Sequence, residues 1–294
     1  MSQRLKHIVA SRVDGLGGRL LNLASTFRIA KKLGLKHLIC WDYPSVPQKA
    51  IYVKLFEGLS FIKLDYFDNK DLKVYYLTRE HNRETGKKEF TVTNSIIENF
   101  DVVVTDHLGL LGLEADRGRI ATKVMGQNKK FREELREAIN SVKSNSYICQ
   151  EVQKFLKKND LKNCVGVHVR RGDVERNVKK GVDLHKFRQV EQFFDCLDGI
   201  RAKKIFLCTE GEDVRREFIE KYGLGNILFY PARSYIRECP AIRSEGPDWE
   251  VEESLNDAFI DNLLLSECKK IVHVSSNFTE AAALRGGQDL IKVD

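Results

Sequence analysis

The hydrophobic pattern of the chain alternates short apolar runs with stretches of helical periodicity. Residues 7–11 form the first apolar run, and apolar side chains then recur at helical spacing over residues 19–33. Gly34 follows directly and predicts the end of that helix. Apolar runs at residues 36–41 and 100–106 predict two more strands. Strands that alternate with helices are typical of an α/β fold with parallel sheets.

The second half of the chain repeats this pattern after a charged helical stretch at residues 129–158, where we place the domain junction. We expect two Rossmann-like domains, residues 1–150 and 151–294, that face each other across a central cleft. Ligands of such folds bind beyond the carboxyl ends of the strands. The elements predicted here are strands at 165–169, 203–210, 227–230 and 270–276, and helices at 186–200, 213–222, 253–270 and 277–287.

Composition and charge narrow the class of protein. The 294 residues carry a net charge of +7, but lysine pairs such as 31–32, 157–158 and 203–204 are spread evenly, which indicates a solvated surface. No basic cluster is interleaved with aromatic residues, so we expect no nucleic-acid partner. The 7 cysteines contain no C-x-x-C pair, which favours a reducing compartment without a zinc site. No apolar run has the length of a signal peptide or a membrane span, so we expect a cytoplasmic protein without a membrane span.

A glycine-rich loop, SRVDGLGGRLLN, joins the first strand to the first helix. Gly15, Gly17 and Gly18 let the backbone approach a ligand, and a helix N-terminus attracts anions. The loop is similar to a dinucleotide fingerprint, with Asp42 at the end of the second strand, so an NAD(P)-dependent oxidoreductase is one alternative. Leu20 at the sixth position argues against it. A tight turn that packs helix on sheet is the other alternative.

Two adjacent arginines follow the buried run in CVGVHVRRGDVERN. Guanidinium groups bind phosphate through two hydrogen bonds and keep their charge, so Arg170 or Arg171 is expected to reach a ligand while the other braces the loop. Asp173 is placed to hold an arginine or to bond a ribose or base. His168 alternates with the valines of the strand and faces its opposite side. The stretch therefore predicts an anion site at a strand end.

Two further strand ends carry hydroxyl and carboxyl groups. In IVHVSSNFTEAAALRGG, Asn277 is expected to cap a helix with Glu280 as its partner three positions later. Its hydroxyl groups come from Ser275, Ser276 and Thr279, which lie beside the free N–H groups of that helix. The stretch FLCTEGED likewise ends a strand and places a threonine and a glutamate at another helix start.

Together these motifs resemble a known family. GVHVRRGD resembles the H-x-R-R-x-D signature of the fucosyltransferases that include alpha-1,6, alpha-1,2, protein O- and Nod-factor enzymes. IFLCTEGEDV resembles their second motif, and DAFIDNLLLSECKKIVHVSSNFTEAAALRGG is similar to the third. DGLGGRLLNLASTFRIAKKLG is similar to the N-terminal glycine loop and helix. The resemblance implies a GT-B fold, GDP-fucose as donor, inversion at the sugar carbon, a glycan or glycoconjugate acceptor, and no metal or further cofactor.

The resemblance also implies roles for single residues. Arg170 would contact the diphosphate and stabilise the leaving group, and Arg171 would assist or brace it. His168 and Asp173 would contact the nucleoside. The N-terminal domain would carry the acceptor side and the C-terminal domain the GDP-sugar. The other residues expected to border the donor are Gly17, Gly18, Thr209, Glu210, Ser275, Ser276, Asn277, Phe278 and Thr279.

Chemical reasoning from the residues agrees with fixed cations at the leaving group. A departing diphosphate needs a metal or fixed cations and helix dipoles, and no D-x-D motif occurs in a suitable loop. Direct displacement also needs a general base for the acceptor hydroxyl; Glu175 is the first candidate and Asp183 the second. A pseudoenzyme that keeps nucleotide binding without transfer is a further alternative.

Overall fold

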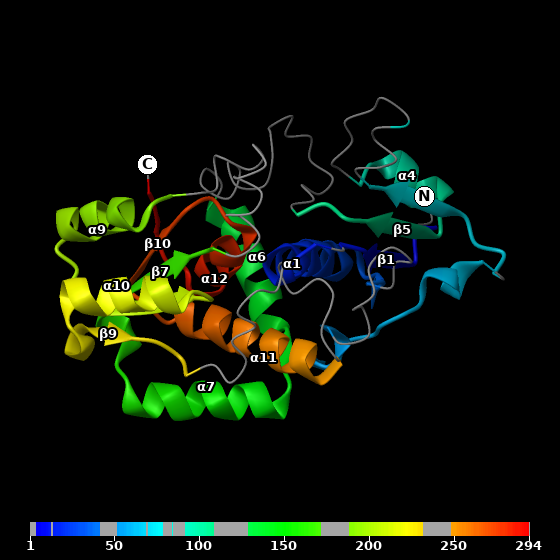
Figure 1. The fold of residues 1–294 in the computed structure, drawn as a ribbon. Coiled ribbons are helices and arrows are strands. Elements are labelled where there is room, and N and C mark those ends of the chain that lie inside the picture. The colour runs from blue at the N-terminus through cyan, green and yellow to red at the C-terminus, as the bar shows by residue number, and fades with distance from the viewer. Residues whose placement is uncertain are drawn as a thin grey trace. The chain divides into compact units, whose positions relative to one another are not determined.

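The chain folds into two compact units, residues 1–143 and 144–294. The computed structural model describes residues 4–12, 14–41, 52–68, 70–78, 84, 92–108, 129–171, 188–231 and 248–293, and each unit is considered by itself (Figure 1). Both units contain a parallel sheet with helices, which confirms the predicted α/β class. The acceptor and donor roles expected for residues 1–150 and 151–294 stay predictions.

The N-terminal unit has a four-stranded parallel sheet in the order β2-β1-β5-β4. One face packs on the first helix around Ile8, Ile29 and Val103, and the opposite face packs on Phe67. The elements are β1 His7–Ala10, α1 Leu16–Leu33, β2 Lys36–Ile39, β3 Phe56–Glu57, η1 Leu64–Phe67, β4 Val74–Leu77, α4 Asn94–Asn99, β5 Val102–Thr105 and α6 Lys129–Ser141.

Helix α1 begins three residues before the predicted start. Gly15 is its N-cap residue, so the helix already contains Gly17 and Gly18, and the glycine loop itself is short. The predicted end is confirmed: Gly34 has φ 65° and its N–H donates to Ala30 O. Only glycine takes this left-handed conformation without strain, which is why the helix stops there.

The C-terminal unit has a five-stranded parallel sheet in the order β11-β10-β7-β8-β9. Its last strand, β11, has no counterpart among the predicted elements. The elements are α7 Ser146–Lys158, η2 Leu161–Asn163, β7 Val165–Val169, α9 Val190–Gly199, β8 Ile205–Thr209, α10 Glu212–Tyr222, η4 Leu224–Asn226, β9 Ile227–Leu228, α11 Asp248–Leu265, β10 Lys270–His273, α12 Asn277–Gly286 and β11 Leu290–Lys292.

The helical stretch predicted over residues 129–158 is interrupted at the junction of the two units. Helix α6 ends at Ser141, the short strand β6 covers Lys143–Ser144, and α7 begins at Ser146. Asn145 ends the interruption, because its side chain accepts a hydrogen bond of 2.9 Å from Ile148 N and caps α7. The one helical stretch predicted from the sequence over residues 129–158 therefore corresponds to two helices, α6 and α7.

Strand β7 lies between two different layers of the C-terminal unit. Val167 and Val169 pack on α9 and α10 through Phe193 and Phe218. The alternate residues face α11, and Gly166 is needed there: an added Cβ would lie 2.5 Å from a methyl group of Leu265. This close approach fixes α11 against the strand that leads to the arginine pair.

No described helix is long and apolar enough to cross a membrane.

Candidate functional site

Three predicted loops leave neighbouring strands at one edge of the C-terminal sheet. Strands β10, β7 and β8 are adjacent, and His168 is paired with His273 on one side and with Cys208 on the other. Because the strands are parallel, the residues after β10, β7 and β8 emerge side by side. This places Ser275, the arginine pair and Glu210 at the same carboxyl edge, as sequence spacing predicted.

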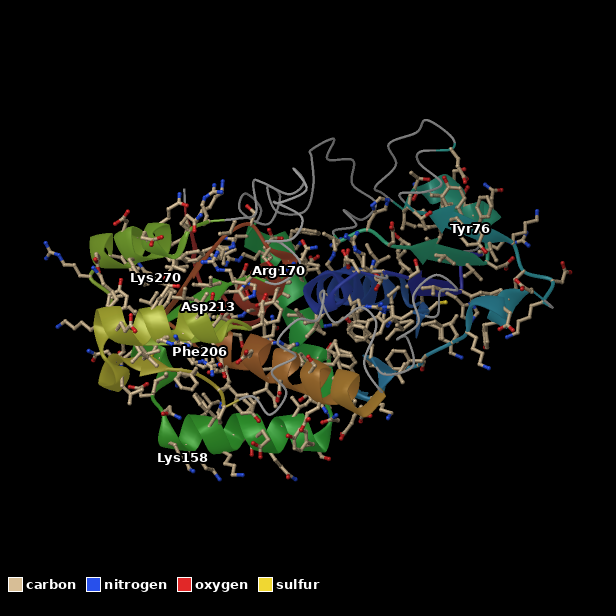
Figure 2. The ribbon with its side chains drawn as sticks, in the orientation of Figure 1. Tyr76, Lys158, Arg170, Phe206, Asp213 and Lys270 are labelled. Atoms are coloured by element: carbon tan, nitrogen blue, oxygen red, sulfur yellow. The ribbon has the colours of Figure 1, made fainter. Side chains whose placement is uncertain are left out.

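The arginine pair begins directly after β7. Arg170 is exposed and Arg171 is half-buried, and Figure 2 places Arg170 at the carboxyl end of the strand. The backbone N–H of Arg171 donates to Glu210 Oε1 at 2.8 Å. Thr209 Oγ1 accepts from Gly211 N at 3.2 Å, which orders the following turn. Glu210 thus holds the backbone of Arg171, and Thr209 orders the turn that carries Glu210.

His168 faces the α11 and α12 layer, as its alternation with the valines predicted. Its ring stacks on Phe278 with centroids 4.8 Å apart and planes inclined by 30°. Burial, together with the charges of Arg170 and His273, lowers the pKa of His168 to about 3. The imidazole is therefore neutral near pH 7 and offers one donor and one acceptor, with Phe278 as an aromatic wall.

Thr279 and His273 connect β10 to the start of α12. Thr279 is fully buried, and its hydroxyl donates to Ser276 O at 2.9 Å. The same oxygen lies 2.8 Å from His273 Nδ1, so it accepts the Nδ1 proton of a neutral imidazole. Burial lowers the pKa of His273 to about 4. The Thr279 hydroxyl therefore makes buried hydrogen bonds inside the site and does not lie on its surface.

The predicted cap of α12 is wrong by one residue. Ser276, with extended backbone angles, is the N-cap, and its Oγ accepts from Phe278 N at 3.2 Å. Asn277 is the first helical residue, so Glu280 is fourth in the helix and cannot close the expected capping box. Glu280 Oε2 is instead buried without a hydrogen bond to any described residue, and burial raises the pKa of Glu280 to about 7. Serine and asparagine are both favoured as N-cap residues, so the sequence did not distinguish Ser276 from Asn277.

Helix α11 brings acidic side chains behind the site that sequence reasoning missed. Asp257 and Asp261 lie four residues apart, so they share one face of the helix. Cys208 Sγ lies 3.8 Å from Asp261 O, which puts this turn next to the His168 row. Burial and the neighbouring Asp257 raise the pKa of Asp261 well above its usual value, while Arg215 opposes this. Two acids at helical spacing, directly followed along the same face by Leu264 and Leu265, were the available signal.

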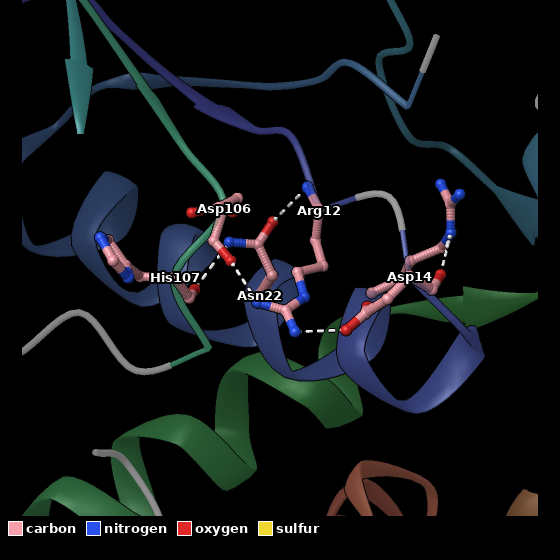
Figure 3. A network of polar contacts seen from close by, with 6 residues as sticks. Arg12, Asp14, Asn22, Asp106 and His107 are labelled. Atoms are coloured by element: carbon pink, nitrogen blue, oxygen red, sulfur yellow. Dashed lines mark hydrogen bonds and ion pairs between the residues drawn. The ribbon is translucent and has the colours of Figure 1, made fainter. Parts of the chain in front are cut away.

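The glycine loop of the N-terminal unit carries a polar network of its own (Figure 3). Arg12 is 6% exposed, pairs with the Asp14 carboxylate and donates to Asp106 O at 3.1 Å. Asn22 Oδ1 accepts from Arg12 N at 3.2 Å, and its Nδ2 donates to His107 O at 2.7 Å. These side chains tie the ends of β1 and β5 to α1, and none of them was among the predicted site residues.

Gly17 and Gly18 are buried in the first turn of α1. A Cβ at Gly18 would lie 2.1 Å from Asp14 Oδ1, so the absence of a side chain leaves room for the acid that pairs with Arg12. Arg19 Nε donates to Asp14 O at 2.8 Å, and its guanidinium lies over the Tyr52 ring at 4.1 Å. The loop thus has a packing role, and the expected donor contact of Gly17 and Gly18 stays a prediction.

Some candidates fall outside the described residues. Asp173, Glu175 and Asp183 lie in residues 172–187, and Asp42 lies in residues 42–51. The choice of general base therefore stays open. Within the described ranges, no group of three or more histidine, cysteine, aspartate or glutamate residues is arranged to hold a metal ion.

Comparison with known proteins identifies the fold. No protein-family model and no curated protein sequence matches the chain. Among solved structures, the fucosyltransferase NodZ from Bradyrhizobium is similar with a TM-score of 0.58 and 17% identity, covering 95% of this chain and 91% of that one. NodZ alpha-1,6-fucosyltransferase soaked with GDP-fucose gives a TM-score of 0.58 and 18% identity over 95% and 92%.

A plant structure extends the comparison. A mutant of Arabidopsis thaliana FUT1 in complex with GDP has a TM-score of 0.57 and 14% identity, covering 99% of this chain and 71% of that one. At these identities the likeness concerns the fold. The predicted GT-B-like fold is confirmed, and the chain has the fold of the fucosyltransferases that its motifs resemble.

Proposed function

We propose that the chain is a glycosyltransferase that moves fucose from GDP-fucose to a hydroxyl group of a glycan or glycoconjugate, with inversion and without a metal ion. The observation that carries the proposal is the meeting of the arginine pair, the Thr209–Glu210 turn and the start of α12 at one sheet edge. Its support is that structures with this fold were solved with GDP or GDP-fucose.

The chemistry of the leaving group explains the need for this edge. Cleavage of the sugar–phosphate bond moves an electron pair onto a diphosphate oxygen, and fixed positive charge stabilises that oxygen. Arg170 is exposed at the strand end and offers two parallel N–H donors. The N-terminus of α12 adds N–H groups and a favourable dipole, with the Ser275 and Ser276 hydroxyls beside it. Charge stabilisation of this kind does not require a cation from solution.

The nucleoside is assigned to the neighbouring aromatic wall. Phe278 and the neutral ring of His168 form a stacked pair behind Arg170. An aromatic face binds a planar base by stacking, and a neutral imidazole adds hydrogen bonds without repelling Arg170. Asp173 and Asn277 are assigned to the same donor, while Glu175 and Asp183 remain the alternative bases for the acceptor hydroxyl.

Calorimetry with GDP tests the donor site. Wild-type protein is expected to bind GDP, and Arg170→Ala to weaken binding about 30-fold, because a hydrogen bond to a charged group contributes about 2 kcal/mol. Arg216→Ala, which removes an exposed arginine from α10, is the matched control and keeps wild-type affinity. Absence of GDP binding, or equal loss in both variants, contradicts the assignment.

Mass spectrometry of the reaction tests the transfer itself. Incubation with GDP-fucose and a panel of glycans is expected to release GDP and to add one deoxyhexose to an acceptor, equally with EDTA and with added Mg²⁺ or Mn²⁺. GDP binding without turnover would favour the pseudoenzyme. Tight NADH binding with none for GDP would instead favour the oxidoreductase alternative.

A further inference from the structure

The starts of the strands form the edge of the C-terminal sheet that lies opposite the arginine pair. Lys270, Val165, Ile205 and Ile227 are paired in one row, so the starts of β10, β7, β8 and β9 lie side by side. Backbone hydrogen bonds of 2.9 Å from Lys269 N to Cys164 O and from Val165 N to Lys204 O hold this edge together. The residues that precede each strand therefore form one rim.

Lysines dominate this rim. In Figure 2, Lys158 and Lys270 lie at the end of the unit away from Arg170. All six rim lysines are exposed, and none of them takes part in an ion pair within the part of the chain that the structure describes. They come from three segments that are well separated in sequence, and the parallel sheet brings these segments together. The lysine rim consists of Lys158, Lys162, Lys203, Lys204, Lys269 and Lys270.

Acidic residues balance only part of this charge. Asp160, Glu267 and Asp289 lie in the same strand-start segments, and Asp160 Oδ2 already accepts from Asn163 Nδ2 at 2.6 Å. Arg201, two residues before Lys203, adds another exposed cation. The rim therefore keeps a clear positive excess, which attracts anionic surfaces at ordinary ionic strength.

An exposed leucine lies at each end of the rim. Leu224 is 66% exposed in η4, the short helix that precedes β9, and Leu290 is 36% exposed at the start of β11. Strands β9 and β11 are the two outer strands of the sheet, so the leucines flank the lysines on both sides. They are the large exposed hydrophobic residues of the described C-terminal unit.

We propose that the lysine rim, with Leu224 and Leu290, is a docking surface for an anionic lipid membrane. Lysines near an anionic leaflet each add a favourable electrostatic contribution, and leucine side chains at the ends can enter the interface. The partner is a lipid surface instead of a nucleic acid, because the six rim residues are all lysines, with Arg201 the one guanidinium group named beside them, and no aromatic residue among them could stack on a base.

Docking through this rim has a consequence for the opposite edge. Parallel strands separate the rim from Arg170 by the full length of the sheet, so membrane contact leaves the arginine edge uncovered. The inference does not rest on the proposed function, because it uses none of the residues at the arginine edge. If that function holds, the rim would bring the donor site close to acceptors carried by a membrane.

Vesicle sedimentation with the full chain tests the proposal. The probes are vesicles of phosphatidylcholine alone and of phosphatidylcholine mixed equally with phosphatidylglycerol, at low and at physiological salt. Wild-type protein is expected to sediment with the anionic vesicles and to be released by salt. The variant Lys203→Gln/Lys204→Gln/Lys269→Gln/Lys270→Gln is expected to lose about 600-fold in partitioning, at roughly five-fold for each of the four lysines.

A charge-matched variant separates the rim from net charge. Lys32→Gln/Lys63→Gln/Lys129→Gln/Lys130→Gln removes four exposed lysines of the N-terminal unit and keeps wild-type partitioning. Equal loss in both variants overturns the proposal, and so does absence of wild-type binding to the anionic vesicles. Tighter binding to duplex RNA or DNA than to the vesicles at the same salt also overturns it.

The leucines provide a second, salt-independent measurement. Leu224→Ser/Leu290→Ser is expected to lower partitioning about five-fold at physiological salt, because part of each side chain no longer leaves water. Both leucines are exposed, so circular dichroism is expected to show unchanged folding. Partitioning that is unchanged in the leucine variant and also unchanged in the four-lysine rim variant contradicts the proposal even if wild-type protein binds the vesicles.

Discussion

The segments that follow β1 and β7 use arginine in opposite ways. In the N-terminal unit, Arg12 and Arg19 are 6% and 1% exposed and bond to Asp14 and to main-chain oxygens. In the C-terminal unit, Arg170 is exposed at the end of β7, and the backbone N–H of Arg171 donates to Glu210. The buried guanidinium groups stabilise the loop that contains them. The exposed one lies at a strand end in contact with solvent, so the surroundings of an arginine, and not its residue type, decide its role.

Arg19→Ala is expected to show the largest effect. Loss of its hydrogen bond and of its packing on Tyr52 and Trp41 should cost about 3 kcal/mol of unfolding free energy. Urea unfolding followed by Trp41 fluorescence measures this, in a Trp249→Phe background that removes the other tryptophan. Arg170→Ala is the control and should change stability by less than about 0.5 kcal/mol. Similar losses in both would erase the contrast between the loops.

His168, at the arginine edge, is expected to make the free energy of unfolding depend on pH. The unfolded chain protonates His168 near pH 6.5, whereas the folded protein keeps it neutral down to about pH 3. Stability therefore falls as pH decreases through this window, by about 2 kcal/mol from this group between pH 6.5 and roughly pH 5. His168→Gln should remove that part of the loss, measured by urea unfolding at each pH. A pH profile unchanged in the variant would contradict the low pKa.

Glu280 provides a comparison of opposite sign on the neighbouring helix. The pKa of Glu280 is raised from 4.5 to about 7, so between these two pH values the folded protein holds a proton that the unfolded chain has lost. Stability from this group is present below about pH 4.5 and falls as pH rises toward 7. Glu280→Gln should remove this fall, which the same series of unfolding measurements detects.

Gly18→Ala tests whether the Arg12–Asp14 ion pair needs the space that the missing side chain of Gly18 leaves. The new methyl group would displace Asp14 and should cost about 1–2 kcal/mol of unfolding free energy. Gly15→Ala is the matched control, because a Cβ there meets no atom of the described residues within 4 Å and φ is −59°. Thermal unfolding compares the two; equal stability would show that Asp14 adjusts freely and that the network is not rigid.

Glu210→Ala is expected to show the smallest effect. The loop keeps its arginines but loses the acceptor for Arg171 N, so GDP affinity should fall about two- to five-fold. Glu210→Gln should restore most of it, since an amide oxygen also accepts. Glu220→Gln, at an exposed position of α10, controls for the change in charge. A large loss in Glu210→Gln would mean that the carboxylate itself meets the ligand.

Local periodicity was sufficient for most elements of the fold. Strand β7 has the predicted bounds, and α1 ends at Gly34 as predicted, because alternation and glycine punctuation are properties of neighbouring residues. The cap at Ser276 and the break between α6 and α7 were missed, since several polar residues there can end or begin a helix equally well. Competition between adjacent caps is settled by packing.

The sequence by itself determined the α/β class, the three loops at strand ends and the type of charge that each carries. Only the tertiary structure decided which charges are buried and which lie together. Arg12 and Arg19 became interior groups through contacts with residues far along the chain, such as Asp106 and Tyr52. Lysines spread evenly in sequence became one rim, because parallel pairing aligns strand starts that are separated by dozens of residues.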